Sequence, residues 1–224
     1  PYSVHNYELR YWLAAAGVDP DDDVRLVVTP PPRMAARLAL GEIDGFCVGA
    51  PWNAKAVADG SGEIMAYAAD IWRAGPDKVF GLKEAWAQQN PETLHAILRA
   101  LIEAQAWADE PANRPELAHI LAHERYIDAP EDLIARSLLE APAGHAAQDF
   151  IVFHRYAAGF PWRSHAAWFL TQMRRWGQLP PDVDIAAAAQ AAYRPDLYRT
   201  AAAALGCPAP LVDDKVEGLH AGPW

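Results

Sequence analysis

The sequence lacks long apolar runs, a cysteine framework and an excess of positive charge, and each absence excludes a class of protein. No uninterrupted apolar stretch approaches the roughly 20 residues that span a bilayer, so no membrane-spanning helix is predicted. The only two cysteines, Cys47 and Cys207, are too few for a disulfide framework or a cysteine-rich zinc site. With 19 basic against 29 acidic residues, the formal net charge of −10 opposes a nucleic-acid-binding surface.

The chain also lacks an initiator methionine, and its first residues run directly into a helical pattern. We therefore expect an N-terminally truncated sequence, with another lobe and any leader peptide encoded before Pro1. Localisation stays open on the sequence alone, because a leader would lie in that segment. Two free thiols slightly favour a reducing compartment.

The residues that are present predict an α/β region followed by a helical one. Leu9, Trp12, Leu13 and Ala16 share one helix face, which ends at Gly17. Strands are predicted at 24–29, 45–48, 64–67 and 79–82, with helices at 34–40 and 51–58 between them. Such alternation is typical of a mostly parallel sheet, which about 80 residues cannot complete alone.

Beyond residue 82 the pattern is helix upon helix. A helix is predicted to begin at Pro91 with Asn90 as its N-cap. Further helices are predicted at 115–123, 130–139, 164–176, 185–192 and 197–205. Residues 141–148 are expected to form a loop, and the Pro/Gly-rich tail 208–224 is expected to wrap the surface.

An anion-binding site is the first functional hypothesis. Ser3, His5 and Asn6 stand at the start of the first predicted helix, where free N–H groups and the helix dipole favour negative charge. Lys78 precedes the last predicted strand, and α/β folds place ligand crevices at such element ends. His5 would donate a hydrogen bond and Lys78 a positive charge. Spacing alone favours the simpler alternative, in which these residues only cap a helix and face solvent in a turn.

Cys47 suggests an enzyme alternative. Residues 45–49 match the nucleophile-elbow pattern with cysteine in place of serine, and Asp70 followed by His95, His119 or His145 satisfies the order of a triad. Polar residues immediately precede this short strand pattern, whereas an elbow follows a long buried strand. A buried structural cysteine is therefore favoured.

Two other patterns give no metal site, and neither a metal nor a cofactor is expected. His119 and His123 are four residues apart on one predicted helix, but no Glu or third ligand accompanies them. The acidic turn 19–23 lacks the glycine and terminal glutamate of a calcium loop. An aromatic group is expected to lie in the core, since no basic groove accompanies it: Phe160, Trp162, Trp168, Phe169 and Trp176.

Four ordered segments resemble the nitrate/bicarbonate solute-binding protein family of ABC transporters. They are 5–13 (HNYELRYWL), 30–34 (PPPRM), 44–53 (DGFCVGAPWN) and 160–165 (FPWRSH), and the similarity covers nearly the whole chain. The resemblance implies a type II periplasmic-binding-protein-like α/β fold, incomplete here. Residues 1–80 would be part of its second lobe, and 81–224 a helical region that returns to the first lobe.

The same resemblance implies ligand contacts and partners. His5 and Lys78 match family residues that contact a small planar oxyanion, with Ser3 and Asn6 as weaker candidates. By analogy with the family, nitrate or nitrite is the favoured ligand and bicarbonate the alternative. The other family contacts, whose identity decides between these anions, fall before Pro1. No catalysis and no direct nucleic-acid binding are implied.

Two roles share this fold. One is the extracytoplasmic binding component of an ABC importer with permease and ATPase partners. The other is a cytoplasmic nitrate/nitrite sensor that holds an RNA-binding antiterminator protein. The sequences of residues 49–53 and 155–165 are closer to those of the sensor branch, which slightly favours a cytoplasmic location.

Overall fold

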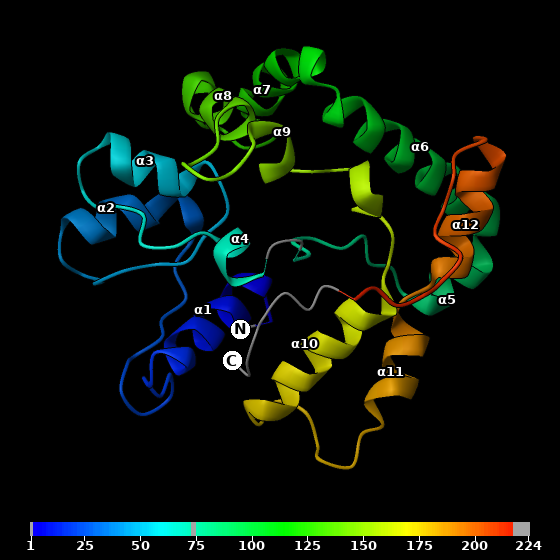
Figure 1. The fold of residues 1–224 in the computed structure, drawn as a ribbon, viewed down its shortest axis with the longest axis horizontal. Helices are drawn as coiled ribbons and strands as arrows, with labels where there is room; N and C mark the ends of the chain where they lie inside the picture. The colour runs from blue at the N-terminus through cyan, green and yellow to red at the C-terminus, as the bar shows by residue number, and fades with distance from the viewer. Residues whose placement is uncertain (1, 73–74, 217–224) are drawn as a thin grey trace. The chain divides into compact units, whose positions relative to one another are not determined.

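The computed structural model describes residues 2–72 and 75–216, and the chain forms two compact units. The described part of the first unit comprises residues 2–72, 75 and 111–151. The second comprises residues 76–110 and 152–216. Figure 1 follows the chain through both units, which are described separately.

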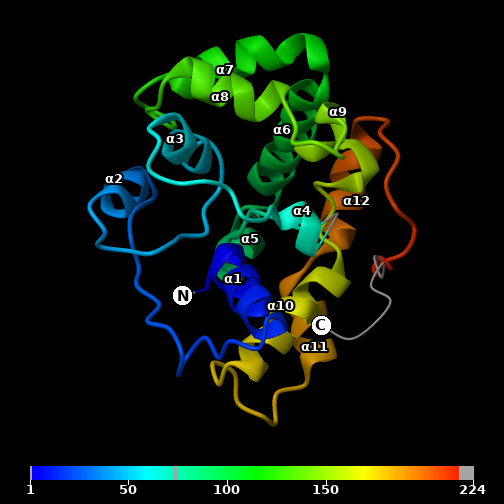
Figure 2. The ribbon, with the colours of Figure 1, turned by 60° about the vertical axis from the view of Figure 1, so that its left-hand side comes forward.

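The first unit consists of short helices joined by long extended segments (Figures 1 and 2). Its α-helices are α1 (Val4–Ala15), α2 (Met34–Ala39), α3 (Trp52–Ala58), α4 (Ala68–Ile71), α7 (Arg114–Ala122), α8 (Glu131–Leu139) and α9 (Ala147–Phe150), with 3₁₀ turns η1 (Pro31–Arg33) and η2 (Pro111–Asn113). The helix pairs α7 with α8 and α2 with α3 pack together, and α3 also contacts α8.

Local signals account for where α1 begins and ends. The Ser3 side chain accepts a hydrogen bond from the Asn6 backbone N–H at 3.3 Å, which makes Ser3 the N-cap. At the other end, Gly17 has φ +80°, a left-handed conformation that glycine adopts without steric cost. The predicted first helix is confirmed, and so is its stop.

The second unit is built on an aromatic core. Its helices are α5 (Glu84–Gln89), α6 (Pro91–Asp109), α10 (Arg163–Arg175), α11 (Ile185–Ala192) and α12 (Pro195–Ala204), with the 3₁₀ turn η3 (Arg155–Ala157). The Phe160 ring lies 4.7 Å from Trp162 and 5.3 Å from Tyr198, and all three are buried with Ile102. The core role predicted for Phe160 and Trp162 is confirmed.

The tail through residue 216 lies along the second unit, as predicted. Asp213 pairs with both Arg163 and Arg199, and the Arg199 guanidinium also donates to the Pro210 carbonyl at 2.7 Å. The backbone N–H of Lys215 donates to the Ser164 hydroxyl at 3.0 Å. Residues 217–224 of the predicted tail lie outside the described residues.

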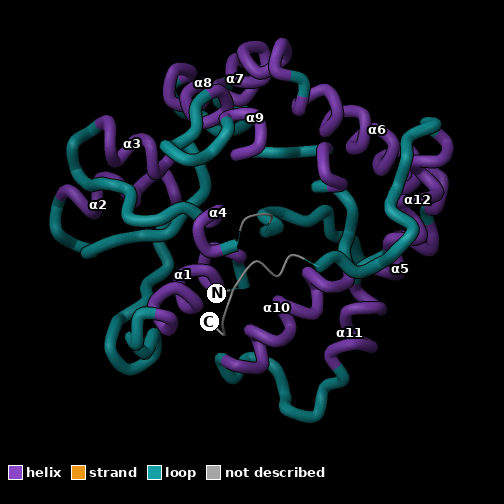
Figure 3. The backbone as a smooth tube through the Cα atoms, in the orientation of Figure 1, coloured by secondary structure: helices purple, strands orange, loops and turns teal. Residues whose placement is uncertain are grey.

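The predicted strands are wrong for residues 2–72 and 75–216, where no strand is formed (Figure 3). Segments 24–29, 45–48, 64–67 and 79–82 are extended loops instead. Val28 is 83% exposed and Met65 75% exposed. A strand needs a neighbouring backbone for its hydrogen bonds, so an apolar β-branched run cannot form one without a partner.

Three short helices were not predicted. α4, α5 and α9 have only four to six residues each, too short for an apolar period to be visible. α9 falls partly within the predicted loop 141–148. The division into lobes at residue 80 stays a prediction.

Candidate anion-binding site

Ser3, His5 and Asn6 lie together at the start of α1 in the first unit. No acidic side chain stands in the first turn of this helix, where a carboxylate would compete with an anion for the free N–H groups. Ser3 acts as the N-cap, and both its hydroxyl and its carbonyl oxygen accept from the Asn6 N–H. The hydroxyl proton of Ser3 can still be donated to an anion.

His5 is half-buried and faces the backbone of Gly49. A Cβ built on Gly49 would lie 3.4 Å from His5 Nε2 and 3.8 Å from its Cε1. A methyl group at this position would therefore be in ordinary van der Waals contact with the edge of the imidazole. Sequence reasoning missed Gly49 as a site residue, although a glycine inside an apolar run is a recognised signal of close backbone approach.

Tyr7 and Glu8 on α1 are buried, and Cys47, two residues before Gly49, is half-buried. Burial raises the pKa of the Cys47 thiol to about 12, and the negative charge of Glu8 adds to the shift. The thiol is therefore neutral at physiological pH and behaves as a small apolar group.

Lys78 belongs to the second unit, in the extended segment before α5. Its side chain is 71% exposed and its ammonium pairs with the neighbouring Asp77 carboxylate. An anion bound by Lys78 would have to compete with that carboxylate. Because His5 belongs to the first unit, the pairing of these two residues stays a prediction.

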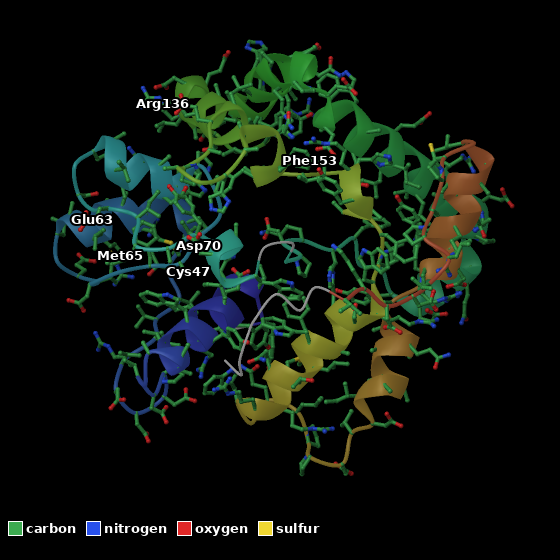
Figure 4. All side chains as sticks on the ribbon, in the orientation of Figure 1. Cys47, Glu63, Met65, Asp70, Arg136 and Phe153 are labelled. Carbon is green, nitrogen blue, oxygen red and sulfur yellow. The ribbon has the colours of Figure 1, made fainter. Side chains whose placement is uncertain are left out.

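Two members of the triad predicted for the enzyme alternative, the acid and one of the candidate histidines, are in contact. Asp70 Oδ1 lies 3.3 Å from His145 Nε2, and Asp70 Oδ2 accepts the Tyr67 backbone N–H at 2.9 Å. The Cys47 pKa is shifted by burial and then by the charge of Glu8, and no histidine contributes to the shift. A thiol held protonated in this way is a poor nucleophile, so the geometry does not support the elbow. Figure 4 labels Cys47 and Asp70.

The metal and membrane alternatives gain no support from the part of the chain that the structure describes. Over residues 2–72 and 75–216, no group of three or more His, Cys, Asp or Glu side chains could hold a metal ion. His119 is exposed and faces Glu131, with Nδ1 to Oε2 at 2.9 Å. Within the same ranges no helix has the length and apolarity to cross a bilayer.

Comparison with known proteins decides the family. The model of the NMT1-like family matches residues 1–122, more than half of the 224-residue chain. The chain belongs to the NMT1-like family. The match includes α1, Gly49 and Lys78, so every residue of the candidate site lies within it.

Among curated proteins, this NMT1-like chain is similar to nitrate/nitrite binding proteins NrtA. It is 39% identical to NrtA of Synechococcus elongatus and 37% identical to NrtA of a Nostoc species, in each case over 92% of this chain and 48% of the relative. A third relative, the nitrate import ATP-binding protein NrtC of Synechocystis, is 38% identical over 98% of this chain and 33% of its own length. The chain thus spans about half the length of the NrtA proteins that it matches.

A solved structure confirms the fold of this NMT1-like chain at family level. The periplasmic nitrate-binding protein NrtA from Synechocystis matches with a TM-score of 0.89 and 33% identity, over 96% of this chain and 58% of that one. The resemblance to a periplasmic-binding-protein fold, present here in part, is therefore confirmed. The NrtA relatives are named as nitrate- or nitrite-binding proteins.

Proposed function

We propose that this NMT1-like protein binds nitrate or nitrite reversibly, as the solute-binding component of a nitrate importer, and catalyses no reaction. The observation that carries the proposal is the structural match to a periplasmic nitrate-binding protein, with a TM-score of 0.89 at 33% identity. The Cys47 pKa of about 12 supports the non-catalytic part, because it leaves the elbow without an activated nucleophile.

In the proposed site, His5 donates a hydrogen bond to the oxyanion and Lys78 supplies the positive charge. The protein carries a formal net charge of −10, so its long-range field repels anions and capture must depend on local donors. The N-terminal end of α1 and the Ser3 hydroxyl add donors beside His5. The close approach of Gly49 bounds the space next to Nε2.

The partners in this proposal are the permease and ATPase components of an ABC importer. Similarity to the nitrate import ATP-binding protein NrtC, 38% identical over 226 residues, supports an importer. The alternative sensor role, with an RNA-binding antiterminator as partner, stays a prediction. Pull-down of an antiterminator that nitrate releases would favour it.

Bicarbonate is the second candidate ligand. The bicarbonate transport ATP-binding protein CmpC of Synechococcus elongatus is 39% identical over 92% of this chain. Both anions are small, planar and trigonal, so His5 and Lys78 suit either. Nitrate is favoured because the structural match is to a nitrate-binding protein.

Calorimetric titration of the full-length protein with nitrate, nitrite and bicarbonate tests this function. We expect nitrate or nitrite to bind, and Lys78→Ala to weaken binding roughly tenfold or more through loss of a charge-assisted hydrogen bond. Lys83→Ala is the matched control, since Lys83 is an exposed lysine at the start of α5. Equal affinities in the two variants would refute the role of Lys78, and binding of bicarbonate alone would refute the choice of ligand.

A further inference from the structure

A buried acid lies on the same helix as His5, the proposed hydrogen-bond donor. Glu8 is 5% exposed and is the only acidic residue of α1, Val4–Ala15. A negative charge this close to an anion site repels the ligand, and a buried charge is costly unless neighbouring groups compensate for its lost hydration. Glu8 would therefore oppose nitrate binding unless it acts through another side chain.

Glu8 and His5 lie on the same side of α1. Residues three apart on an α-helix are neighbours on its surface, so the two side chains are about one turn apart. Gly49 lies against the His5 ring, and the charge of Glu8 acts on the Cys47 thiol, two residues before Gly49. Three helical residues rise about 4.5 Å and two extended residues about 6.6 Å, so one short segment can reach both side chains. Segment 47–49 therefore runs along α1 from Glu8 to His5.

Three elements of the first unit lie around His5, namely α1, segment 45–49 and α4, and their phenol and thiol groups do not balance its charge. On α1, burial raises the pKa of Tyr7 above its ordinary value, and Tyr11 lies on another face of the helix. In segment 45–49, the pKa of Cys47 is about 12. Tyr7 and Cys47 are therefore neutral at pH 7.

The other charged groups of these three elements contact different residues. Arg10 lies on another face of α1 from the imidazole, and it donates to both carboxylate oxygens of Asp21, at 2.9 Å and 2.7 Å. Asp70 belongs to α4, which contacts α1, and its Oδ1 lies 3.3 Å from His145 Nε2. Glu8 is thus the charged side chain that is placed to act on the imidazole.

The chemistry of nitrate indicates which form of His5 suits it. Nitrate is the anion of a strong acid, so its oxygens carry no proton at neutral pH and only accept hydrogen bonds. A neutral imidazole donates from one nitrogen and presents a lone pair at the other, whereas an imidazolium donates from both. A protonated His5 therefore offers a donor at Nε2 together with a positive charge. A neighbouring carboxylate favours this protonated form.

We propose that Glu8 is a positioning residue, which keeps His5 protonated so that nitrate binds to an imidazolium. The occupied site then holds a cation between two anions, with Glu8 on one side of His5 and nitrate on the other. Such attraction is stronger at a half-buried side chain than in open water. Nitrate affinity should accordingly fall as pH rises and His5 loses its proton. The inference rests on the proposed function, in which His5 contacts the ligand.

Nitrate titrations of the full-length protein at pH 5.5 and at pH 8 test the role of Glu8. Glu8→Gln keeps the shape of the side chain and removes its charge, so His5 gives up its proton at lower pH. We expect this variant to bind nitrate about tenfold more weakly than the unmodified protein at pH 8. At pH 5.5, where His5 is protonated in both proteins, we expect equal affinities.

Glu63→Gln is the matched control, because Glu63 is an exposed acid of the same unit (Figure 4). It should match the unmodified protein at both pH values. If Glu8→Gln weakens binding by the same factor at both pH values, Glu8 only supports the fold. If it tightens binding, Glu8 only repels the anion. Either result would overturn the proposal.

Proton uptake provides a test that needs no Glu8 variant. Nitrate itself binds no proton near neutral pH, so calorimetric titrations at pH 8 in Tris and in phosphate, whose ionisation enthalpies differ, report protons taken up by the protein. We expect uptake of a fraction of a proton, and none in His5→Gln, whose amide gains no proton. Nitrate binding without proton uptake and with equal affinity at both pH values would overturn this inference alone. Absence of nitrate binding at every pH would overturn the proposed function as well.

Discussion

Gly49 lies against the ring of His5, so that a Cβ at position 49 would come to 3.4 Å from Nε2. That distance is ordinary van der Waals contact, which means that a methyl group fits there without forcing the backbone to move. It would, however, occupy space beside the nitrogen proposed to donate to the ligand. A substitution at position 49 can therefore change ligand binding without changing the stability of the fold.

We expect Gly49→Ala to weaken nitrate binding by about tenfold, the scale of one lost hydrogen bond to an anion, while the melting temperature changes little. Titration calorimetry and thermal unfolding measure the two effects. Gly45→Ala is the matched control, because a Cβ there meets nothing within 4 Å. If both variants bind nitrate equally well, the space beside Nε2 is not part of the ligand site.

The thiol of Cys47 should be slow to alkylate. Its pKa of about 12, raised by burial and then by Glu8, leaves on the order of a thousandfold less thiolate at pH 8 than an ordinary cysteine would have. At pH 8, we expect iodoacetamide to label Cys47 at least about tenfold more slowly than it labels free cysteine. Mass spectrometry measures the extent of labelling over time. Rapid, stoichiometric labelling would contradict a half-buried, neutral thiol and reopen the hydrolase alternative.

The tail should be released when Asp213 loses its charge. Asp213 pairs with Arg163 and Arg199, which leaves both guanidinium groups short of a partner in Asp213→Asn. We expect a loss of about 1 to 3 kcal/mol in the free energy of unfolding and faster proteolysis near residue 210, measured by urea titration and limited digestion. The neighbouring Asp214 is exposed, so Asp214→Asn should change neither quantity. Identical behaviour of the two variants would rule out the ion pairs as the fastening of the tail.

Stability should depend on pH through Asp109. Burial alone would raise the pKa of this carboxyl, but the N–H groups of Arg155, Phe153 and His154 together outweigh it, and the pKa is lowered. Asp109 therefore stabilises the fold fully above its unfolded pKa of about 3.9, and the contribution disappears as pH falls through the lower folded value.

The corresponding measurement is the free energy of unfolding of Asp109→Asn at pH 7 and at pH 3. We expect a deficit of about 2 kcal/mol against the unmodified protein at pH 7, and a smaller deficit at pH 3, where the carboxylate begins to protonate. A deficit that is the same at both pH values would mean that the ionised form of Asp109 is not what stabilises the segment.

Helices were predictable from the sequence because their signals are local. The Ser3 cap and Gly17 stop frame α1, and α11 was predicted with the bounds that the structure gives. The strands predicted at 24–29 and 64–67 were wrong, because their signal is not local. A strand depends on a second backbone segment, and no pattern within six residues shows whether that segment is present.

The candidate site likewise contains a part that local sequence signals predict and a part that depends on contacts between distant segments. Ser3, His5 and Asn6 are within four residues of one another, so placing them on one helix turn required only the helix start. The approach of Gly49 to His5 joins segments 44 residues apart, and the bond from Asp109 to Phe153 spans a similar distance. Such contacts follow from packing, which a single sequence does not specify by spacing.

The exposed valines of segment 24–29 bear on how the protein behaves in concentrated solution. A run of β-branched residues without a paired neighbour can stack against the same run in another molecule and seed a β-aggregate. Here three aspartates precede the run, at 21–23, and three prolines follow it, at 30–32. Like charges and missing N–H groups both interrupt such stacking, so these flanks act as gatekeepers against self-association.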